Sequence, residues 1–423
     1  MLIVSQIIEN FESICNSLDK RNFNAKQLLG DVIKFDKDRR ATQTKLDELL
    51  SEINTLSGKI GSLYKKNEID KANILKEKVH ILKNETKSFS KKLIESKEKI
   101  NTALLDIPNV PHELVKKGDS EDDNEIIFDS QNLPQFDKSH LTHWDLSKKL
   151  NIIDFDLGSK VTGSGFPVYL NKGAKLQRAL INYFLDKNIN AGYEEVQVPI
   201  LINEKSGIAT GQLPDKEGQM YHINEDNLYL APTAEVPVTN MFRDSIIDSK
   251  SIPLCLTSYT PCFRREAGSY GSQVRGLNRL HQFDKVEIVR IENPRNSYKA
   301  LDSMVDHVKS ILSELELPFR IIRLCGGDLG FTSALTYDFE VYSSAQKKWL
   351  EVSSVSNFET FQSNRLKLRI NENGKKILAH TLNGSALALP RILACMIENF
   401  QEKDSILIPK ALRSYTGFDK ISL

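Results

Sequence analysis

Residues 254–291 place charged and aromatic side chains at the spacing of two strands joined by a loop. Arg264 and Glu266 follow one apolar run, and Phe283 and Glu287 lie within a second. Because successive side chains on a strand point to opposite faces, Arg264 and Glu266 should project together, as should Phe283 and Glu287. Charged side chains on one face of such a strand pair could be presented to a ligand.

Glu287 is the unusual residue of this stretch, because an unpaired charge in an apolar run is costly. We expect the first strand to end in residues 263–266 and the second to cover residues 281–289. The second strand would then present the Glu287 carboxylate to a ligand. An internal salt bridge with Arg264 or Arg279 is the alternative that the residues leave open.

Three further segments place polar side chains within apolar runs. The first has Thr233 and Glu235 on one face, and the second, residues 349–357, offers a carboxylate and hydroxyls that suit Mg²⁺ or its waters. The third, residues 380–393, predicts a strand, a turn and an apolar helix with one arginine. Each has a structural explanation too: a helix cap, a satisfied core polar group or an ion pair, in which a protein carboxylate would serve the arginine as well as phosphate.

The elements that position these segments include a long helical arm. Apolar side chains recur at alternating steps of three and four in residues 32–63 and again in residues 75–103, with a polar break at 64–70. This pattern predicts an antiparallel coiled-coil hairpin roughly 45 Å long at about 1.5 Å per residue. Lysines are in excess on its tip and second helix, which suits either a phosphate backbone or a solvated helix surface.

A compact second domain is expected after the arm. An acidic linker at 118–124 precedes an apparent strand at 166–170, an amphipathic helix at 174–188 and a strand at 193–199. The sequence contains no G-x-x-x-x-G-K-[ST] motif, so nucleotide chemistry of the P-loop kind is excluded.

Composition limits the class of protein. At 423 residues with 40% hydrophobic residues, the chain can hold two or three domains with a substantial core, and its net charge of +1 identifies no partner. Its five cysteines are scattered without a C-x-x-C pair, which argues against zinc or a disulfide framework and favours a reduced, cytoplasmic protein. We see no secretory segment and no apolar run long enough for a membrane span.

The motifs occur in a specific order: T-A-E, then F-R-x-E-A-G with R-G-L-x-R-L-H-Q-F-x-K-V-E, then E-V-S-S-x-S-N-F-x-x-F-Q, then H-T-L-N-G-S. In this order the chain resembles seryl-tRNA synthetase of the bacterial type, a class II aminoacyl-tRNA synthetase, over nearly its whole length. The resemblance implies an α+β protein with a coiled-coil tRNA-binding arm in residues 1–105. A class II catalytic domain with an antiparallel sheet would occupy residues 106–423.

The implied activity is the joining of L-serine to tRNA-Ser through a seryl-adenylate, with ATP and Mg²⁺ but no zinc, and with tRNA-Sec left open as a second acceptor. Arg264 at the α-phosphate and Arg391 at the γ-phosphate would be the catalytic residues. Serine would be bound by Thr233, Ala234, Glu235, Arg264, Glu287, Asn383 and Ser385. ATP would be bound by Arg264, Arg265, Glu266, Phe283, Glu351, Val352, Ser353, Ser354 and Arg391. Glu351 and Ser354 would hold Mg²⁺, and tRNA would contact Lys65, Lys66, Lys76, Lys83, Lys87 and Arg275.

The chain departs from the family pattern at a few positions. The loop around Ser272 and Gln273 lacks an Arg-Asp pair that many members carry, and Ala386 and Pro390 replace frequent glycines. Proline fits the first turn of a helix but would kink its interior. The motifs contain no histidine–carboxylate dyad, so His281 and His380 are expected to be structural.

The family also implies a homodimer with residues 174–199 at the interface, in which each arm reaches tRNA bound largely by the other subunit. Two competing functions remain. An amino acid:carrier-protein ligase would not need the long basic arm, and a catalytically dead RNA-binding paralogue would have lost the ligand-binding residues.

Overall fold

The computed structural model describes residues 1–131, 133, 140–267 and 275–423. These residues form two compact units, one made of Met1–Asp19 and Phe23–Pro108 and the other of Lys20–Asn22 and Asn109–Leu423. We describe each unit by itself. None of the helices in the described part of the chain combines the length and apolar character that a membrane span needs.

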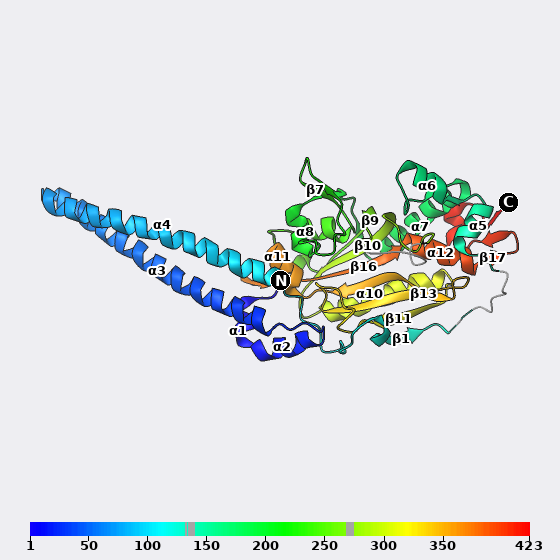
Figure 1. The fold of residues 1–423 in the computed structure, drawn as a ribbon, viewed down its shortest axis with the longest axis horizontal. Helices are drawn as coiled ribbons and strands as arrows, with labels where there is room; N and C mark the ends of the chain where they lie inside the picture. Colours follow the sequence, from blue (N-terminus) through cyan, green and yellow to red (C-terminus); the bar gives the residue numbers. More distant parts are fainter. Residues whose placement is uncertain (132, 134–139, 268–274) are drawn as a thin grey trace. The chain divides into compact units, whose positions relative to one another are not determined.

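The first unit is the predicted helical hairpin, drawn in blue and cyan in Figure 1. Short helices α1 (Val4–Glu9) and α2 (Phe11–Asp19) precede α3 (Lys26–Lys65) and α4 (Ile69–Leu105). The heptad residues of the two long helices pack against each other, among them Leu49, Ile53, Leu56, Val79 and Leu82. The helices are longer than the heptad runs indicated, because their ends continue past the apolar seam, and 40 residues span about 60 Å.

The second unit is built on an eight-stranded sheet in the order β1-β11-β12-β13-β16-β10-β9-β4. Its neighbouring strands are antiparallel, except that the edge strand β4 runs parallel to β9. The predicted α+β architecture is thereby confirmed. The strands are β1 (Glu125–Asp129), β4 (Glu194–Glu195), β9 (Leu254–Phe263), β10 (Gln282–Glu292), β11 (Phe319–Arg323), β12 (Leu335–Ser343), β13 (Lys348–Asn357) and β16 (His380–Ala388).

Three helices cover one face of this sheet. They are α7 (Asn171–Asn190), α10 (Ser297–Glu314) and α12 (Leu389–Asn399), and their buried apolar side chains share one core with Val286 and Ile288 of β10. Alternate residues of β10 point to the opposite face, which is where the predicted site residues lie.

Smaller elements surround the sheet. The helices are α5 (His143–Lys149), α6 (Phe155–Val161), α8 (Glu204–Thr210), α9 (Glu235–Asn240), α11 (Thr360–Leu366) and α13 (Arg413–Thr416). The short strands are β2 (Ile153–Asp154), β3 (Val168–Tyr169), β5 (Leu201–Asn203), β6 (His222–Ile223), β7 (Leu228–Leu230), β8 (Ile246–Asp248), β14 (Arg369–Glu372), β15 (Lys375–Leu378), β17 (Gln401–Glu402), β18 (Ser405–Leu407) and β19 (Lys420–Ser422).

Several predicted boundaries were wrong. The strands expected at 166–170 and 193–199 shrink to two residues each, in β3 and β4, because most of each segment makes no ladder hydrogen bonds. β9 ends at Phe263, so Arg264 and Glu266 follow the strand instead of ending it, and Glu266 has a left-handed backbone with φ of 48°. In a strand, the side chains of residues 264 and 266 would have pointed to the same face. The loop that is observed does not impose this direction.

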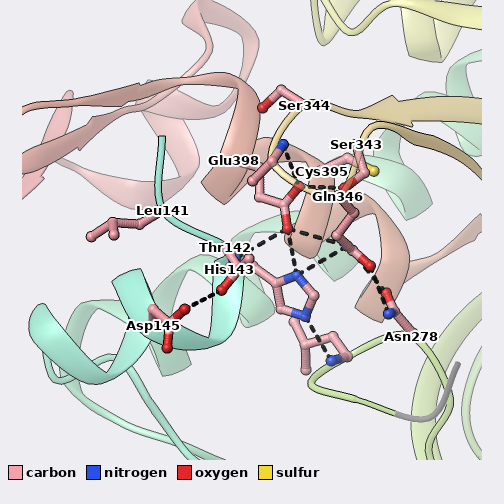
Figure 2. A network of polar contacts seen from close by, with 12 residues as sticks. Leu141, Thr142, His143, Asp145, Asn278, Ser343, Ser344, Gln346, Cys395 and Glu398 are labelled. Atoms are coloured by element: carbon pink, nitrogen blue, oxygen red, sulfur yellow. Dashed lines mark hydrogen bonds and ion pairs between the residues drawn. The ribbon is translucent and has the colours of Figure 1, made fainter. Parts of the chain in front are cut away.

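A buried polar network fixes the segment that enters β10, shown in Figure 2. His143 and Glu398 have no exposed surface, and the His143 Nδ1 atom lies 2.8 Å from Glu398 Oε1. The backbone N–H of Leu277 donates to His143 Nε2 at 2.9 Å. Since a backbone N–H can only donate, Nε2 carries no proton and Nδ1–H donates to Glu398.

Helix α12, which carries Glu398, also holds Asn278, the residue after Leu277. Arg391 Nε donates to the carbonyl oxygen of Asn278 at 3.0 Å, and Arg391 precedes Glu398 by two helical turns on one face of α12. Gln346 completes the network by donating to Glu398 Oε1 at 3.2 Å and accepting from Asn278 Nδ2 at 2.8 Å. The segment Leu277–Asn278 is therefore fastened to α12 at two points.

We predict that Glu398→Gln destabilises the second unit by about 3 kcal/mol, since the new amide group would face donors and leave buried groups unpaired. Burial raises the pKa of Glu398, but hydrogen bonds from His143 and Ser343 outweigh it, so the pKa lies below the ordinary value of 4.5. The carboxylate therefore stabilises the fold above that value and loses this contribution as the pH falls through its lower folded-state pKa. Urea unfolding of both proteins at pH 7 and in acid measures the difference.

The exposed Glu402, which lies four residues further along the chain and pairs with Lys420, provides the matched control. Glu402→Gln should leave the unfolding free energy nearly unchanged. Equal effects of the two substitutions would contradict the importance of the buried network.

Candidate active site

One face of the sheet gathers polar side chains from three neighbouring strands. β10 contributes Phe283, Lys285 and Glu287, β16 contributes Asn383 and Ser385, and β13 contributes Glu351 and Ser354. The register of the ladders brings them together, since Glu287 pairs with Ser385 between β10 and β16. The segment 232–235 and Arg264 border this face, because Arg264 Nε donates to the Pro232 carbonyl oxygen at 3.3 Å.

Glu287 is buried to 1% exposure and has three polar neighbours. Lys285 Nζ lies 2.8 Å from Glu287 Oε2, Thr233 Oγ1 donates to the same oxygen at 3.2 Å, and Asn383 Nδ2 donates to Oε1 at 3.3 Å. Glu287 therefore does form an internal ion pair, which was the alternative to a ligand role. Neither Arg264 nor Arg279 is its partner. Lys285 makes it, because residues 285 and 287 share a face of β10.

Glu235 is a second buried carboxylate beside Glu287. Burial, and then the charge of Glu287, raise the pKa of Glu235 to about 7, against the opposing effect of a hydrogen bond from Gln362. Gln362 Nε2 donates to Glu235 Oε1 at 2.7 Å. The residues expected to share a face do not lie on one strand: Glu235 begins α9, and its backbone N–H donates to Thr233 Oγ1 at 3.3 Å. Two carboxyl groups and the Lys285 side chain thus lie together in one buried cluster.

Arg264 and Phe283 lie together at the start of β10. The guanidinium carbon of Arg264 is 5.3 Å from the centre of the Phe283 ring. Glu266, which the sequence placed near Arg264, forms an ion pair with Arg279 at 3.0 Å. Arg265 is exposed. An aromatic base stacked on Phe283 would therefore lie next to an arginine that can meet its phosphates.

Arg391 and Glu351 form the other end of the site. Arg391 Nη1 donates to the Glu351 carbonyl oxygen at 2.7 Å and lies 3.4 Å from its carboxylate. The charges of Arg391 and then Arg264 keep the pKa of Glu351 below its usual value. Pro390 lies in the first turn of α12, where its missing N–H costs nothing, so it does not kink the helix.

The donor set around Glu351 fits a magnesium ion. Ser354 Oγ donates to Glu351 Oε1 at 3.3 Å, and Asp338 of β12 pairs with Ser354 across the ladder. Burial, and then the charge of Glu351, raise the pKa of Asp338 well above its usual value, and its Oδ1 atom is buried without a hydrogen-bond partner. These are hard oxygen donors of the kind that Mg²⁺ prefers. Among the described residues, no three His, Cys, Asp or Glu side chains are grouped to hold a metal ion.

The two histidines of the motifs make internal contacts. His380 Nδ1 lies 2.7 Å from Ser297 Oγ, and burial lowers the pKa of His380 to about 4. His281 Nδ1 lies 2.9 Å from the hydroxyl of Tyr221, and its ring stacks on Phe166. Neither contact reaches the polar face of β10, which agrees with the expected structural role.

Sequence reasoning missed three residues of this site. Lys285 could have been found because it lies two residues before Glu287, and residues two apart on a strand point to the same face. Gln362 and Asp338 carry no such signal, because they come from other elements that reach the site only in the folded chain. The loop residues Ser272 and Gln273, where the chain departs from the family pattern, lie outside the described residues.

The expected tRNA contacts lie in both units. The five arm lysines, Lys65, Lys66, Lys76, Lys83 and Lys87, are all exposed on or just after their helices. Arg275 lies in the catalytic unit, with its guanidinium carbon 4.7 Å from the ring centre of Trp144.

Comparison with known proteins adds to this geometry. The seryl-tRNA synthetase N-terminal domain matches residues 1–111, and the class II tRNA synthetase core domain (G, H, P, S and T) matches residues 219–400. The chain is 45% identical to the serine–tRNA ligase of Salinibacter ruber, covering all of this chain and 99% of that protein. It is 41% identical to that of Thermodesulfovibrio yellowstonii, with both chains fully covered.

A solved structure agrees with these relatives. The seryl-tRNA synthetase from Pyrococcus horikoshii, complexed with ATP, matches with a TM-score of 0.88 and 32% identity, covering all of this chain and 99% of that one. Two domain matches, full-length relatives above 40% identity and a full-length structural match all give one answer. The chain therefore belongs to the serine–tRNA ligase family of class II aminoacyl-tRNA ligases.

Proposed function

We propose that this serine–tRNA ligase binds serine at the Glu235–Glu287 end of the sheet face and ATP at the Arg264–Arg391 end. The observation that carries the proposal is the separation of charge on one surface. Buried carboxylates lie at one end, where an ammonium group and a hydroxyl can bind, and arginines lie at the other, where phosphates can bind. The two reactants would meet between them.

In the serine pocket, Glu235 takes the ammonium group and Glu287 the hydroxyl. Thr233, Ala234, Asn383 and Ser385 complete a small wall, and Lys285 forms an ion pair with Glu287. A pocket that hydrogen-bonds the hydroxyl rejects alanine by about 10⁴ or more, because alanine leaves buried polar groups unpaired. Threonine is excluded by the shape of the wall.

In the ATP site, adenine stacks on Phe283 and its amino group donates to Glu266. Arg264 meets the α-phosphate and Arg391 the γ-phosphate, and Arg265, Val352 and Ser353 line the remainder. Glu351 and Ser354 would hold Mg²⁺, which neutralises phosphate charge when it is bound.

The chemistry needs alignment more than proton transfer. The carboxylate oxygen of serine is already a nucleophile at neutral pH, so it attacks the α-phosphorus directly and pyrophosphate leaves. Arg264 and Arg391 stabilise the charge that develops on the phosphates. In the second step the terminal ribose hydroxyl of tRNA attacks the seryl carbonyl carbon and AMP leaves.

The proposal extends to partners and location. Exposed lysines along the arm, residues 1–105, suit the phosphates of tRNA-Ser, with tRNA-Sec as a second acceptor to be tested. A homodimer through residues 174–199 is supported by the exposed apolar side chain of Ile189 next to the edge strand β4. The five free cysteines support a cytoplasmic location.

The direct test is ATP–pyrophosphate exchange with each standard amino acid. We expect exchange with serine, and we expect Glu287→Gln to lower the serine kcat/KM by about 100-fold while narrowing the preference for serine over alanine, since the hydroxyl loses its charged acceptor. The KM for ATP should stay unchanged. Exchange driven better by threonine or proline than by serine would overturn the function, and normal serine activation by Glu287→Gln would leave Glu287 only its ion pair.

The pH dependence should report Glu235. Its pKa of about 7 means that the carboxyl is protonated below neutrality and ionised above it. Because an ammonium group needs the ionised form, the serine kcat/KM should rise about tenfold per pH unit below pH 7 and level off above it. Glu235→Gln should be less active and lack this rise. An equal rise in that variant would assign the ionisation to another group.

The arm lysines should act on tRNA alone. Replacement of Lys65, Lys66, Lys76, Lys83 and Lys87 by alanine should raise the KM for tRNA about tenfold or more and weaken its salt dependence, since fewer phosphate contacts release fewer ions. Serine-dependent exchange should be unchanged. Replacing the exposed Lys375 and Lys376 of the catalytic unit controls for a general loss of charge. An unchanged tRNA KM in the arm variant would mean that these lysines are only a solvated surface.

A further inference from the structure

Gln362 is a buried amide whose three contacts fix its orientation. It lies on α11 with 1% exposure. Its Nε2 atom donates to the Thr210 carbonyl oxygen at 3.3 Å and to Glu235 Oε1 at 2.7 Å, and its Oε1 atom accepts from Thr381 Oγ1 at 2.8 Å. Because a carbonyl oxygen can only accept, the amide nitrogen must face Thr210, and one N–H is left pointing at Glu235.

The charges around Glu235 show what this N–H does. Glu287 opposes ionisation of Glu235, whereas the cations Lys285 and Arg264 favour it from β10 and from the segment after β9. Gln362 of α11, which donates to Glu235, is neutral. Gln362 is the hydrogen-bond donor to the Glu235 carboxylate among the described residues, and its donation lowers the pKa of Glu235 against burial.

We propose that Gln362 is a positioning residue for serine, which holds the Glu235 carboxylate ionised and oriented while leaving its charge free for the substrate ammonium. The inference rests on the proposed serine pocket. A lysine or arginine in this position would also keep the carboxylate ionised, but it would compete with the ammonium for the same charge. A neutral amide donor stabilises the anion without neutralising it.

The other contact of Gln362 connects two walls of the pocket. Thr381 belongs to β16, the strand that also carries Asn383, which donates to Glu287. Gln362 therefore joins Glu235 to the strand that supports Glu287. Both carboxylates that are proposed to read serine are held in one frame.

The test is the pH profile of serine-dependent exchange by Gln362→Met, which keeps the volume but removes both hydrogen-bonding groups. We expect the midpoint of the serine kcat/KM profile to move upward by about one pH unit, which corresponds to about a fivefold loss at pH 7 that approaches about tenfold at lower pH and disappears at higher pH. The KM for ATP should remain within about twofold of the wild-type value, since no ATP ligand is changed.

Two further variants separate positioning from folding. Ser363→Ala removes a neighbouring buried hydroxyl that donates to the Ala379 carbonyl oxygen at 2.5 Å but does not contact Glu235. It should lower thermal stability without moving the pH profile. Thr381→Val leaves the donors of Gln362 in place but frees its Oε1 atom, so it should move the profile in the same direction by less. It also provides a readout if Gln362→Met does not fold.

The possible outcomes test this inference separately from the proposed function on which it rests. Absence of serine-dependent exchange in the wild-type enzyme would remove the proposed function itself. A wild-type enzyme that exchanges normally, with a Gln362→Met or Thr381→Val profile that keeps the wild-type midpoint, would overturn the inference alone. A loss that is equal at every pH and extends to the KM for ATP would show a structural role and would also overturn it.

Discussion

The structure depends on keeping charge buried on one face of an antiparallel sheet. Glu235 and Glu287 are both more than nine-tenths buried and lie in one pocket, where two ionised carboxylates repel each other. Lys285 compensates one of them, and an amide supports the other. The helices α7, α10 and α12 pack on the opposite face, and their apolar core offsets the free-energy cost of burying these charges.

This constraint also explains how the ends of the site differ. At the carboxylate end the polar groups are buried, and burial raises the pKa of Glu235. At the arginine end Glu351 is half exposed, and neighbouring guanidinium groups keep it ionised. One end is therefore suited to a small cation whose water is removed, and the other to a polyanion that stays partly hydrated.

Much of this architecture could be predicted from the sequence. The heptads predict the arm because the apolar seam repeats over many turns, and β10 was predictable because its apolar and polar residues alternate. What could not be predicted depends on residues far apart in sequence. Lys285, the partner of Glu287, could be found only from its position two residues earlier on the same strand. Glu235 begins a helix although the spacing of Thr233 and Glu235 is typical of a strand. Gln362 reaches Glu235 from 127 residues away. The short β3 and β4 show that apolar runs do not become strands without neighbours to bond.

The network around His143 and Glu398 has a consequence for how the catalytic unit comes apart. Glu398 accepts hydrogen bonds from α5 and from the turn after β12, and His143 in turn accepts one from the segment before β10. A buried carboxylate that loses any of these donors is strongly destabilised. The segments that supply the donors are therefore expected to become ordered or to unfold together. Arg391 stands on the same helix as Glu398. Local fraying that would release this arginine is therefore suppressed, and the Arg391–Glu351 end of the site should persist until the whole unit unfolds cooperatively.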